Sequence, residues 1–174
     1  MKLKILTISL ATIALMLLVS QVNAQAGAKK KADKATQEWR YEIECAGTGV
    51  QGTYLIKVWS YSKKPVVAFE QSKKNAVHGV VFKGFKGNST SGCTSQRPIA
   101  PNPTVEQEQS DFFTKFFSNG GDYMKYISNS QSMSNDVVKV GKEYKVGVVV
   151  SVAKDQLRKD LETAGIIKGL SSGF

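Results

Sequence analysis

Apolar and polar residues alternate in two early segments of the chain, and a later segment is apolar almost throughout. Residues 39–45 and 53–61 place large or apolar side chains at every second position, which is typical of half-buried strands. Residues 144–152 form a nearly continuous valine-rich run, which fits a strand near the centre of a sheet. Three shorter segments are also expected to be strands: 80–82, 123–128 and 137–140.

The spacing changes to a helical period after Pro65. The apolar residues of this segment fall near one helical face: Val66, Phe69, Ala76, Val77 and Val80. We expect a helix that covers the first two strands and ends near His78 and Gly79. His78 is the only histidine of the chain. Beside a helix-ending glycine, it is expected to be a helix cap or a surface residue rather than a base or metal ligand.

A second helix is predicted from Thr104, because Thr104 and Gln107 have the spacing of a capping box. Its large apolar residues are Val105, Phe112, Phe113, Phe116 and Phe117. Such an aromatic face can bind a partner, but at helical spacing it is more typical of a core.

A third helix follows the valine-rich strand directly, at 154–164. Leu157 and Leu161 share one stripe, and Gly165 stands where a left-handed helix end is expected. We expect this helix to lie back on its own sheet, with the leucine stripe buried against Val148 and Val150. These elements predict an α+β fold, a single-domain sandwich with two to three helices packed on a mixed, largely antiparallel sheet.

Three glycines between the first two strands match G-x-G-x-x-G at Gly47, Gly49 and Gly52. A dinucleotide site requires a helix after this motif, so that the helix N-terminus holds the pyrophosphate. Here a strand is predicted to follow. We therefore expect a turn between antiparallel strands.

The first 38 residues are not expected to belong to the folded core, and their pattern indicates where the protein is sent. Residues 1–24 combine a basic start, an apolar run and a small-residue end, which predicts a secretory signal peptide. Residues 25–38 are expected to be a disordered basic tail. Its lysines are Lys29, Lys30, Lys31 and Lys34. Alternatively, this tail has a function and binds an anionic envelope surface, with a binding free energy of about 1 kcal/mol per basic residue.

The protein is expected to be exported and to be periplasmic or outer-membrane-associated, with no transmembrane span in its mature form and one folded domain at 39–174. The chain has 24 Lys and Arg against 14 Asp and Glu, a net charge of +10. The signal segment contains two lysines and no acidic residue, so the mature charge is +8. Nucleic acid is not an expected partner, because the basic residues of the folded part are scattered among acidic ones.

Residues 84–103 are rich in Gly, Ser, Thr, Asn and Pro and have no periodicity. A segment of this length is too long for a simple connection, which indicates a binding loop or a loop held by a covalent link. Its candidate binding residues are Lys86, Asn88 and Arg97.

The only two cysteines are Cys45 and Cys93. In an exported chain they are expected to form a disulfide, which in the chain-entropy model stabilises the fold by roughly 4 kcal/mol. The alternative, a catalytic thiol activated by His78, has no evident orienting group beside it.

Two features of the chain resemble the small α/β domain of the flagellar assembly protein T and related envelope lipoproteins. The first is the helix at Ala76 and Val77 that leads into a strand. The second is the strand at 144–152 that leads into the helix from Lys154 to Leu161. As a whole, the chain also resembles exported proteins of Gram-negative bacteria. The resemblance implies a structural or assembly role in the envelope without catalysis, and it implies no particular functional residue. The lipobox cysteine of the lipoprotein members is missing, so the resemblance does not extend to a lipid anchor.

No catalytic residue, cofactor-binding residue or metal ligand is predicted. We expect a non-enzymatic envelope protein that works through contacts with another envelope protein. The alternative is a small carbohydrate-binding module or hydrolase that uses the 84–103 loop. A free sheet edge or exposed apolar patch would favour the first, and a concave site with perturbed pKa values the second.

Overall fold

The computed structural model describes residues 39–169 apart from 91, 101, 134 and 135, and also residues 27 and 31. The predicted signal peptide at 1–24 and most of the predicted tail at 25–38 lie outside the described residues. Of the four tail lysines, Lys31 is described, and it is exposed.

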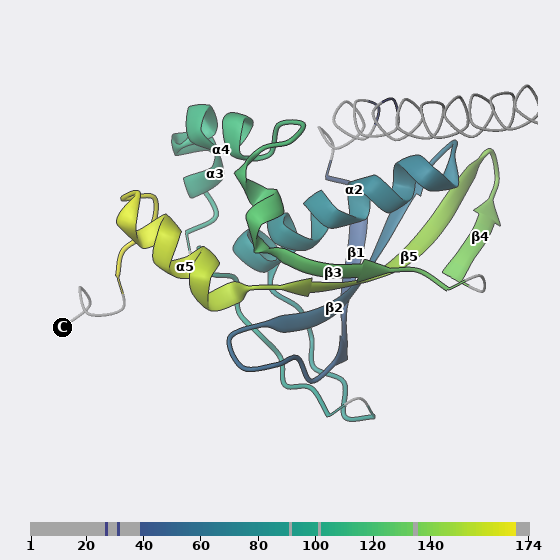
Figure 1. Ribbon diagram of the computed structural model, residues 1–174, viewed down its shortest axis with the longest axis horizontal. Coiled ribbons are helices and arrows are strands. Elements are labelled where there is room, and N and C mark those ends of the chain that lie inside the picture. Colours follow the sequence, from purple (N-terminus) through teal and green to yellow (C-terminus); the bar gives the residue numbers. More distant parts are fainter. Residues whose placement is uncertain are drawn as a thin grey trace, which may run out of the picture.

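The described strands form one sheet (Figure 1). They are β1 (Tyr41–Gly47), β2 (Tyr54–Ser62), β3 (Ile127–Gln131), β4 (Val137–Val140) and β5 (Glu143–Val152). The order is β1-β2-β5, and both β3 and β4 pair with the outer side of β5. Every one of these pairings is antiparallel. The predicted α+β class with a largely antiparallel sheet is therefore confirmed.

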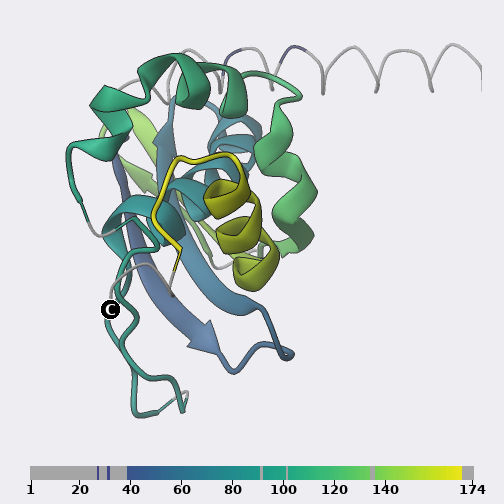
Figure 2. The ribbon, with the colours of Figure 1, turned by 90° about the vertical axis from the view of Figure 1, so that its left-hand side faces the viewer.

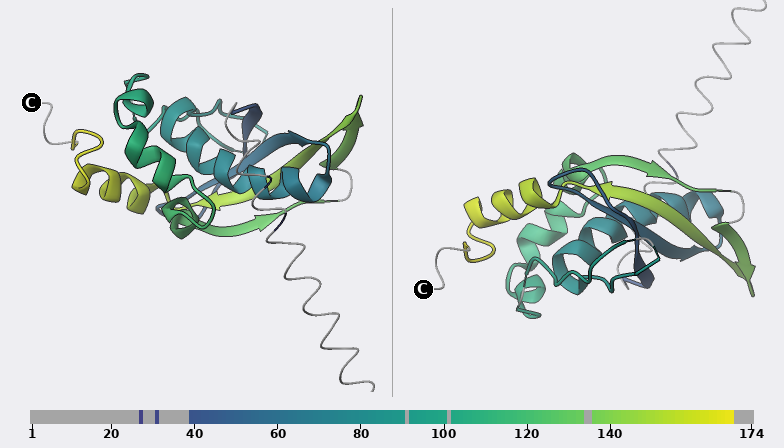
Figure 3. Two further views of the ribbon diagram at one scale, coloured as in Figure 1. Left: turned by 90° about the horizontal axis from the view of Figure 1, so that it is seen from above. Right: turned by 90° about the horizontal axis from the view of Figure 1, so that it is seen from below.

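The described helical segments are α2 (Pro65–His78), η2 (Gly79–Lys83), α3 (Val105–Glu108), α4 (Ser110–Phe116), η3 (Asp122–Tyr126) and α5 (Lys154–Thr163). α2 begins at a proline, whose missing N–H is harmless in the first helical turn. This helix packs across β2 and β5, and it is the main cover of the sheet (Figures 1 and 3).

The core lies between α2 and the inner face of the sheet. The inward side chains of the two central strands are buried: Ile56, Val58, Ser60, Val146, Val148, Val150 and Val152. Ser60 is the one polar member, and its hydroxyl oxygen accepts hydrogen bonds from Ser72 Oγ and Asn75 Nδ2 of α2, each at 2.8 Å. A buried hydroxyl is tolerated because it is hydrogen-bonded.

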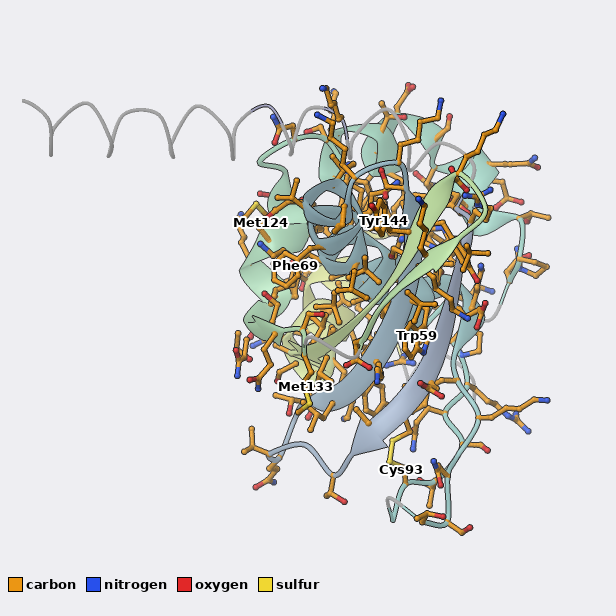
Figure 4. The ribbon with its side chains drawn as sticks, turned by 90° about the vertical axis from the view of Figure 1, so that its right-hand side faces the viewer. Trp59, Phe69, Cys93, Met124, Met133 and Tyr144 are labelled. Atoms are coloured by element: carbon orange, nitrogen blue, oxygen red, sulfur yellow. A yellow bond between two sulfur atoms is a disulfide. The ribbon has the colours of Figure 1, made fainter. Side chains whose placement is uncertain are left out.

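The other face of the sheet is aromatic and charged. Trp59 on β2 pairs with Gly147 on β5, where an added β-carbon would lie 2.8 Å from the indole ring. The glycine therefore leaves room for the ring, which lies flat on the sheet (Figure 4). The amines of Lys57 and Lys145 lie 4.5 and 5.1 Å from the centre of the Trp59 ring, and Trp59 Nε1 donates to Glu44 at 2.8 Å.

The predicted strand at 80–82 is wrong. These residues lie in η2, a π-helical turn that continues α2, and Val80 and Val81 are buried. The turn ends where the Gly84 N–H donates to the Gly79 carbonyl at 2.8 Å. A short buried apolar run has no periodicity that separates strand from helix, which explains the error.

The predicted strand at 123–128 is also largely wrong. Residues 122–126 form η3, a 3₁₀-helix, and the strand begins only at Ile127 and continues to Gln131. Because side chains three residues apart eclipse in a 3₁₀-helix, Tyr123 and Tyr126 both face the core and are buried.

The second helix is shorter and more broken than predicted, with α3 and α4 separated at Gln109. Thr104 does not act as a capping residue, since its backbone is helical and its side chain makes no capping hydrogen bond. The Asn102 side chain instead accepts the Thr104 N–H at 3.0 Å. The prediction that the aromatic face is core is correct for Phe113, Phe116 and Phe117, which are buried.

α5 follows β5 as predicted, and Gly165 ends it with a left-handed backbone at φ 69°. Leu157 and Leu161 are both buried, also as predicted. The expected direction of the helix is wrong, however. α5 continues past the end of β5 and packs against η3 (Figures 1 and 3).

Contacts with several segments hold α5 in this place. Tyr126 of η3 donates its hydroxyl to Asp160 at 2.9 Å, and the Arg158 guanidinium donates to the Ile99 carbonyl at 3.4 Å. The inward valines Val148 and Val150 lie on the face of β5 that α2 covers. They are therefore not the surface that buries the leucine stripe.

Candidate functional site: a basic hollow beside β1

Residues 84–98, predicted as an irregular loop, form a narrow hairpin, which we call the 84–98 hairpin. Phe85 and Gln96 exchange backbone hydrogen bonds of 3.0 and 2.9 Å, and Asn88 and Cys93 exchange bonds of 3.1 and 3.0 Å. Gly84 has φ 66°, and a β-carbon there would lie 2.2 Å from the Gln96 carbonyl oxygen. Glycine is therefore required where the two sides of the hairpin meet.

The hairpin is fixed to the domain near its tip, at its middle and at its base. The predicted disulfide between Cys45 and Cys93 is present and joins the tip region to β1 (Figure 4). Tyr54 donates its hydroxyl to Gln96 Oε1 at 2.7 Å. At the base, the N–H groups of Ile99 and Ala100 donate to carbonyl groups of η2 at 3.1 and 2.9 Å. The disulfide spans 48 residues and stabilises the fold by about 4 kcal/mol in the chain-entropy model.

A cavity of about 790 Å³ separates β1 from the hairpin. It is lined by residues 43–45, 83–89 and 96–98, and we call it the basic hollow. The hairpin and β1 run side by side along it (Figure 2). Successive side chains of a strand point to opposite faces of a sheet. A cavity lined by three consecutive strand residues therefore lies against the edge of that strand, here the outer edge of β1.

Basic side chains from both sides of the hairpin line the hollow. Lys86 comes from the first side of the hairpin and Arg97 from its second, while Lys83 is the last residue of η2. Lys86 and Arg97 make no ion pair with a described residue. Glu44 is the only carboxylate in the lining, and it accepts a hydrogen bond from Trp59. The hollow therefore carries an excess of positive charge.

Lys83 lines the hollow where η2 meets the hairpin. Its amine lies 3.8 Å from the centre of the Tyr41 ring, and it donates to the Trp39 carbonyl at 3.4 Å. Partial burial lowers the pKa of Lys83, and nearby Glu106 opposes that shift. The cation is held over an aromatic face, which is a favourable place for it.

The structure brings all three candidate loop residues to this one cavity, since Lys86, Asn88 and Arg97 each line it. Lys83 and the β1 edge were not among the candidates. The predicted disulfide was the available signal, because a link from Cys93 to Cys45 must place the hairpin beside β1.

A smaller cavity of about 250 Å³ lies where the β1–β2 turn meets the hairpin, and Cys45 and Cys93 line it. Its lining contains the three glycines of the 47–52 segment and no charged residue. Gly47 is the last residue of β1, and the next element is β2, which begins at Tyr54. Gly49 and Gly52 therefore lie in a turn between antiparallel strands, as predicted.

His78 was expected to be a helix cap or a surface residue. It is the last residue of α2, but the surface alternative is wrong, because only 3% of the residue is exposed. Its Nδ1 lies 2.6 Å from the Tyr41 hydroxyl, and its Nε2 lies 3.1 Å from Glu106 Oε1. Trp39 stacks on the ring, with centroids 3.5 Å apart. Burial lowers the pKa of His78, although the hydrogen bond to Glu106 opposes the shift. The imidazole thus joins the start of β1, the end of α2 and the start of α3.

Both ring nitrogens of His78 can form their hydrogen bonds when the imidazole is neutral. Nε2–H donates to Glu106, and Nδ1 accepts the proton of Tyr41, whose pKa is raised by burial. Both ring nitrogens are therefore engaged. Within the described segments, no group of three or more His, Cys, Asp and Glu could hold a metal ion.

Comparison with models of protein families, with curated proteins and with solved structures found no match for this chain. None of the helices in the described part of the chain is long and apolar enough to cross a membrane.

Proposed function

We propose that this protein is a non-catalytic binding protein of the cell envelope that receives an anionic partner in the basic hollow. The observation that carries this proposal is the lining of the basic hollow. It contains three basic side chains, Lys83, Lys86 and Arg97, and one carboxylate, Glu44, which already accepts a hydrogen bond from Trp59. A concave surface lined by one sign of charge concentrates ligands of the opposite sign.

The contrast with other basic residues supports this assignment. On the outer sheet face, Lys57 pairs with Asp136 at 2.6 Å and Lys145 pairs with Glu42 at 2.8 Å. Those cations are neutralised within the fold. Lys86 and Arg97 in the hollow are exposed and make no ion pair with a described residue, so they remain available to a ligand.

A role in binding rather than catalysis agrees with the chemistry of the described side chains. Ammonium and guanidinium groups attract and orient an anion. His78, the only histidine, is buried with both nitrogens hydrogen-bonded. The envelope location is supported by the predicted signal peptide and by the disulfide, because disulfides persist in oxidising compartments.

The test measures binding of poly-L-glutamate to the purified protein by calorimetry at low salt. We expect the double variant Lys86→Gln/Arg97→Gln to bind about 10 to 30 times more weakly, since each lost contact is worth about 1 kcal/mol. The matched control is Lys139→Gln/Lys142→Gln, which removes the same charge from exposed positions at the β4–β5 turn.

The control should change affinity less than about threefold. An equal loss in both variants would show that only the overall charge matters, and it would contradict a site in the hollow.

A further inference from the structure

We infer that the anionic partner is an extended acidic peptide segment, which adds to the sheet as a further strand along the outer edge of β1. This inference rests on the proposed function and specifies the partner's class. Its main observation is the free strand edge that forms one wall of the hollow.

Among the described strands, β1 pairs only with β2. No backbone hydrogen bond outside that pairing involves residues 41–46 in the described part of the chain. The edge thus presents N–H and C=O groups to the hollow, where Ile43, Glu44 and Cys45 line the wall. An unpaired edge of this kind is a template for another strand.

The 84–98 hairpin lines the far side of the hollow and does not itself pair with β1. Its two sides are bonded to each other, and the Cys45–Cys93 disulfide fixes it beside the strand. The cavity of about 790 Å³ falls in the range of ligand sites, roughly 300–1,000 Å³. The described residues therefore leave the space beside β1 open.

The lining determines which side chains the added strand should carry. Carboxylates of the added strand can pair with the basic side chains of Lys83, Lys86 and Arg97. Apolar side chains can contact Phe85 and Pro98. Since side chains of a strand alternate, a sequence of alternating acidic and apolar residues fits both requirements.

Other occupants fit less well. A second copy of this chain would bring its own basic hollow to the same edge, in a protein whose net charge is +10. A polyanion without peptide groups would satisfy the charges but not the strand edge. At the opposite edge of the sheet, the described strands β3 and β4 are short and pair with different parts of β5. They therefore form a shorter and interrupted edge for an added strand.

The test compares four ligands of three kinds by calorimetry with the purified protein. The first is a capped eight-residue peptide of alternating glutamate and valine, the second is the same peptide N-methylated at every second residue, and the third is inorganic polyphosphate. N-methylation removes hydrogen-bond donors from one edge of the peptide without changing its charge. We prepare both methylation registers, so that each edge of the peptide is blocked in turn.

We expect the unmodified peptide to bind, and one methylation register to weaken it by at least about tenfold. Amide hydrogen exchange should slow in the complex at those residues of 42–46 whose N–H groups point away from β2, because these groups become hydrogen-bonded. Lys86→Gln/Arg97→Gln should weaken the peptide as well, and Lys139→Gln/Lys142→Gln should not.

Different failures separate the two proposals. If both methylated peptides bind as well as the parent, or if polyphosphate alone binds, strand addition is wrong and the anionic site remains. If neither peptide nor polyphosphate binds, both proposals fail. If the free protein is a dimer that the peptide dissociates, a second copy occupies the edge, and an acidic partner is wrong.

Discussion

The imidazole of His78 connects the buried Tyr41 hydroxyl to Glu106, whose side chain is only partly buried. Tyr41 is buried, and its hydroxyl lies 2.6 Å from Nδ1, while Glu106 lies 3.1 Å from Nε2. Buried polar groups are tolerated when each has a partner, and the neutral imidazole supplies one donor and one acceptor. Protonation would place a second donor opposite the Tyr41 hydroxyl and add a charge inside the core.

We therefore predict a pKa for His78 below the usual 6.5. Because the folded state disfavours the protonated form, this group's contribution to stability is complete above about pH 6.5 and is lost as the pH falls from there toward the folded-state pKa. NMR titration is unambiguous, since the chain has one histidine. A pKa at or above 6.5 would contradict the buried neutral imidazole.

Stability measurements provide a second check. The free energy of unfolding should fall between pH 7.5 and 5.5, and this fall should be smaller in His78→Gln, which cannot take up a proton.

The sequence could not reveal the cluster of His78, Tyr41 and Glu106. Tyr41 and Glu106 lie 37 and 28 residues away from His78, and only the fold brings them to it.

At the scale of single elements, the sequence predicted the strands that alternate and failed where apolar runs are short. β1, β2, β4 and β5 lie close to their predicted positions, because period-two patterns and valine-rich runs are strong strand signals. η2 and η3 were both taken for strands. In each case the helical turn buries its apolar residues through contacts with distant parts of the chain, which local pattern does not show.

The direction of α5 could not be predicted for a similar reason. The leucine stripe correctly indicates which face of the helix is buried, but not what covers it. The answer depends on η3, which was expected to be a strand, and on the Arg158 contact with Ile99.

Leu161→Ala should lower the free energy of unfolding by about 2–5 kcal/mol, because it removes a buried side chain and leaves a cavity. Lys159→Ala is the matched control on the same helix. Its side chain is exposed, so its effect should stay below about 0.5 kcal/mol. Denaturant melts of the two variants measure both values. A nearly neutral Leu161→Ala would mean that the stripe is exposed in solution.

For the whole molecule, the disulfide links the fold to the candidate site. It joins the end of β1 to a hairpin that begins 37 residues after β1 ends, and between them lies the basic hollow. The pairing could be predicted because the chain has only two cysteines. It placed Lys86, Asn88 and Arg97 near β1, whereas the position of Lys83 depends on η2, which was not predicted.

The most direct test of this account locates the ligand on the protein. An ¹⁵N-labelled sample is titrated with the acidic peptide of alternating glutamate and valine, and backbone amide shifts are followed by NMR. We predict that the large shifts fall at residues 43–45, 83–89, 96 and 97, which line the hollow and have backbone N–H groups. Shifts that spread over exposed lysines, or gather at the β4–β5 turn around Lys139 and Lys142, would contradict a specific anionic site beside β1.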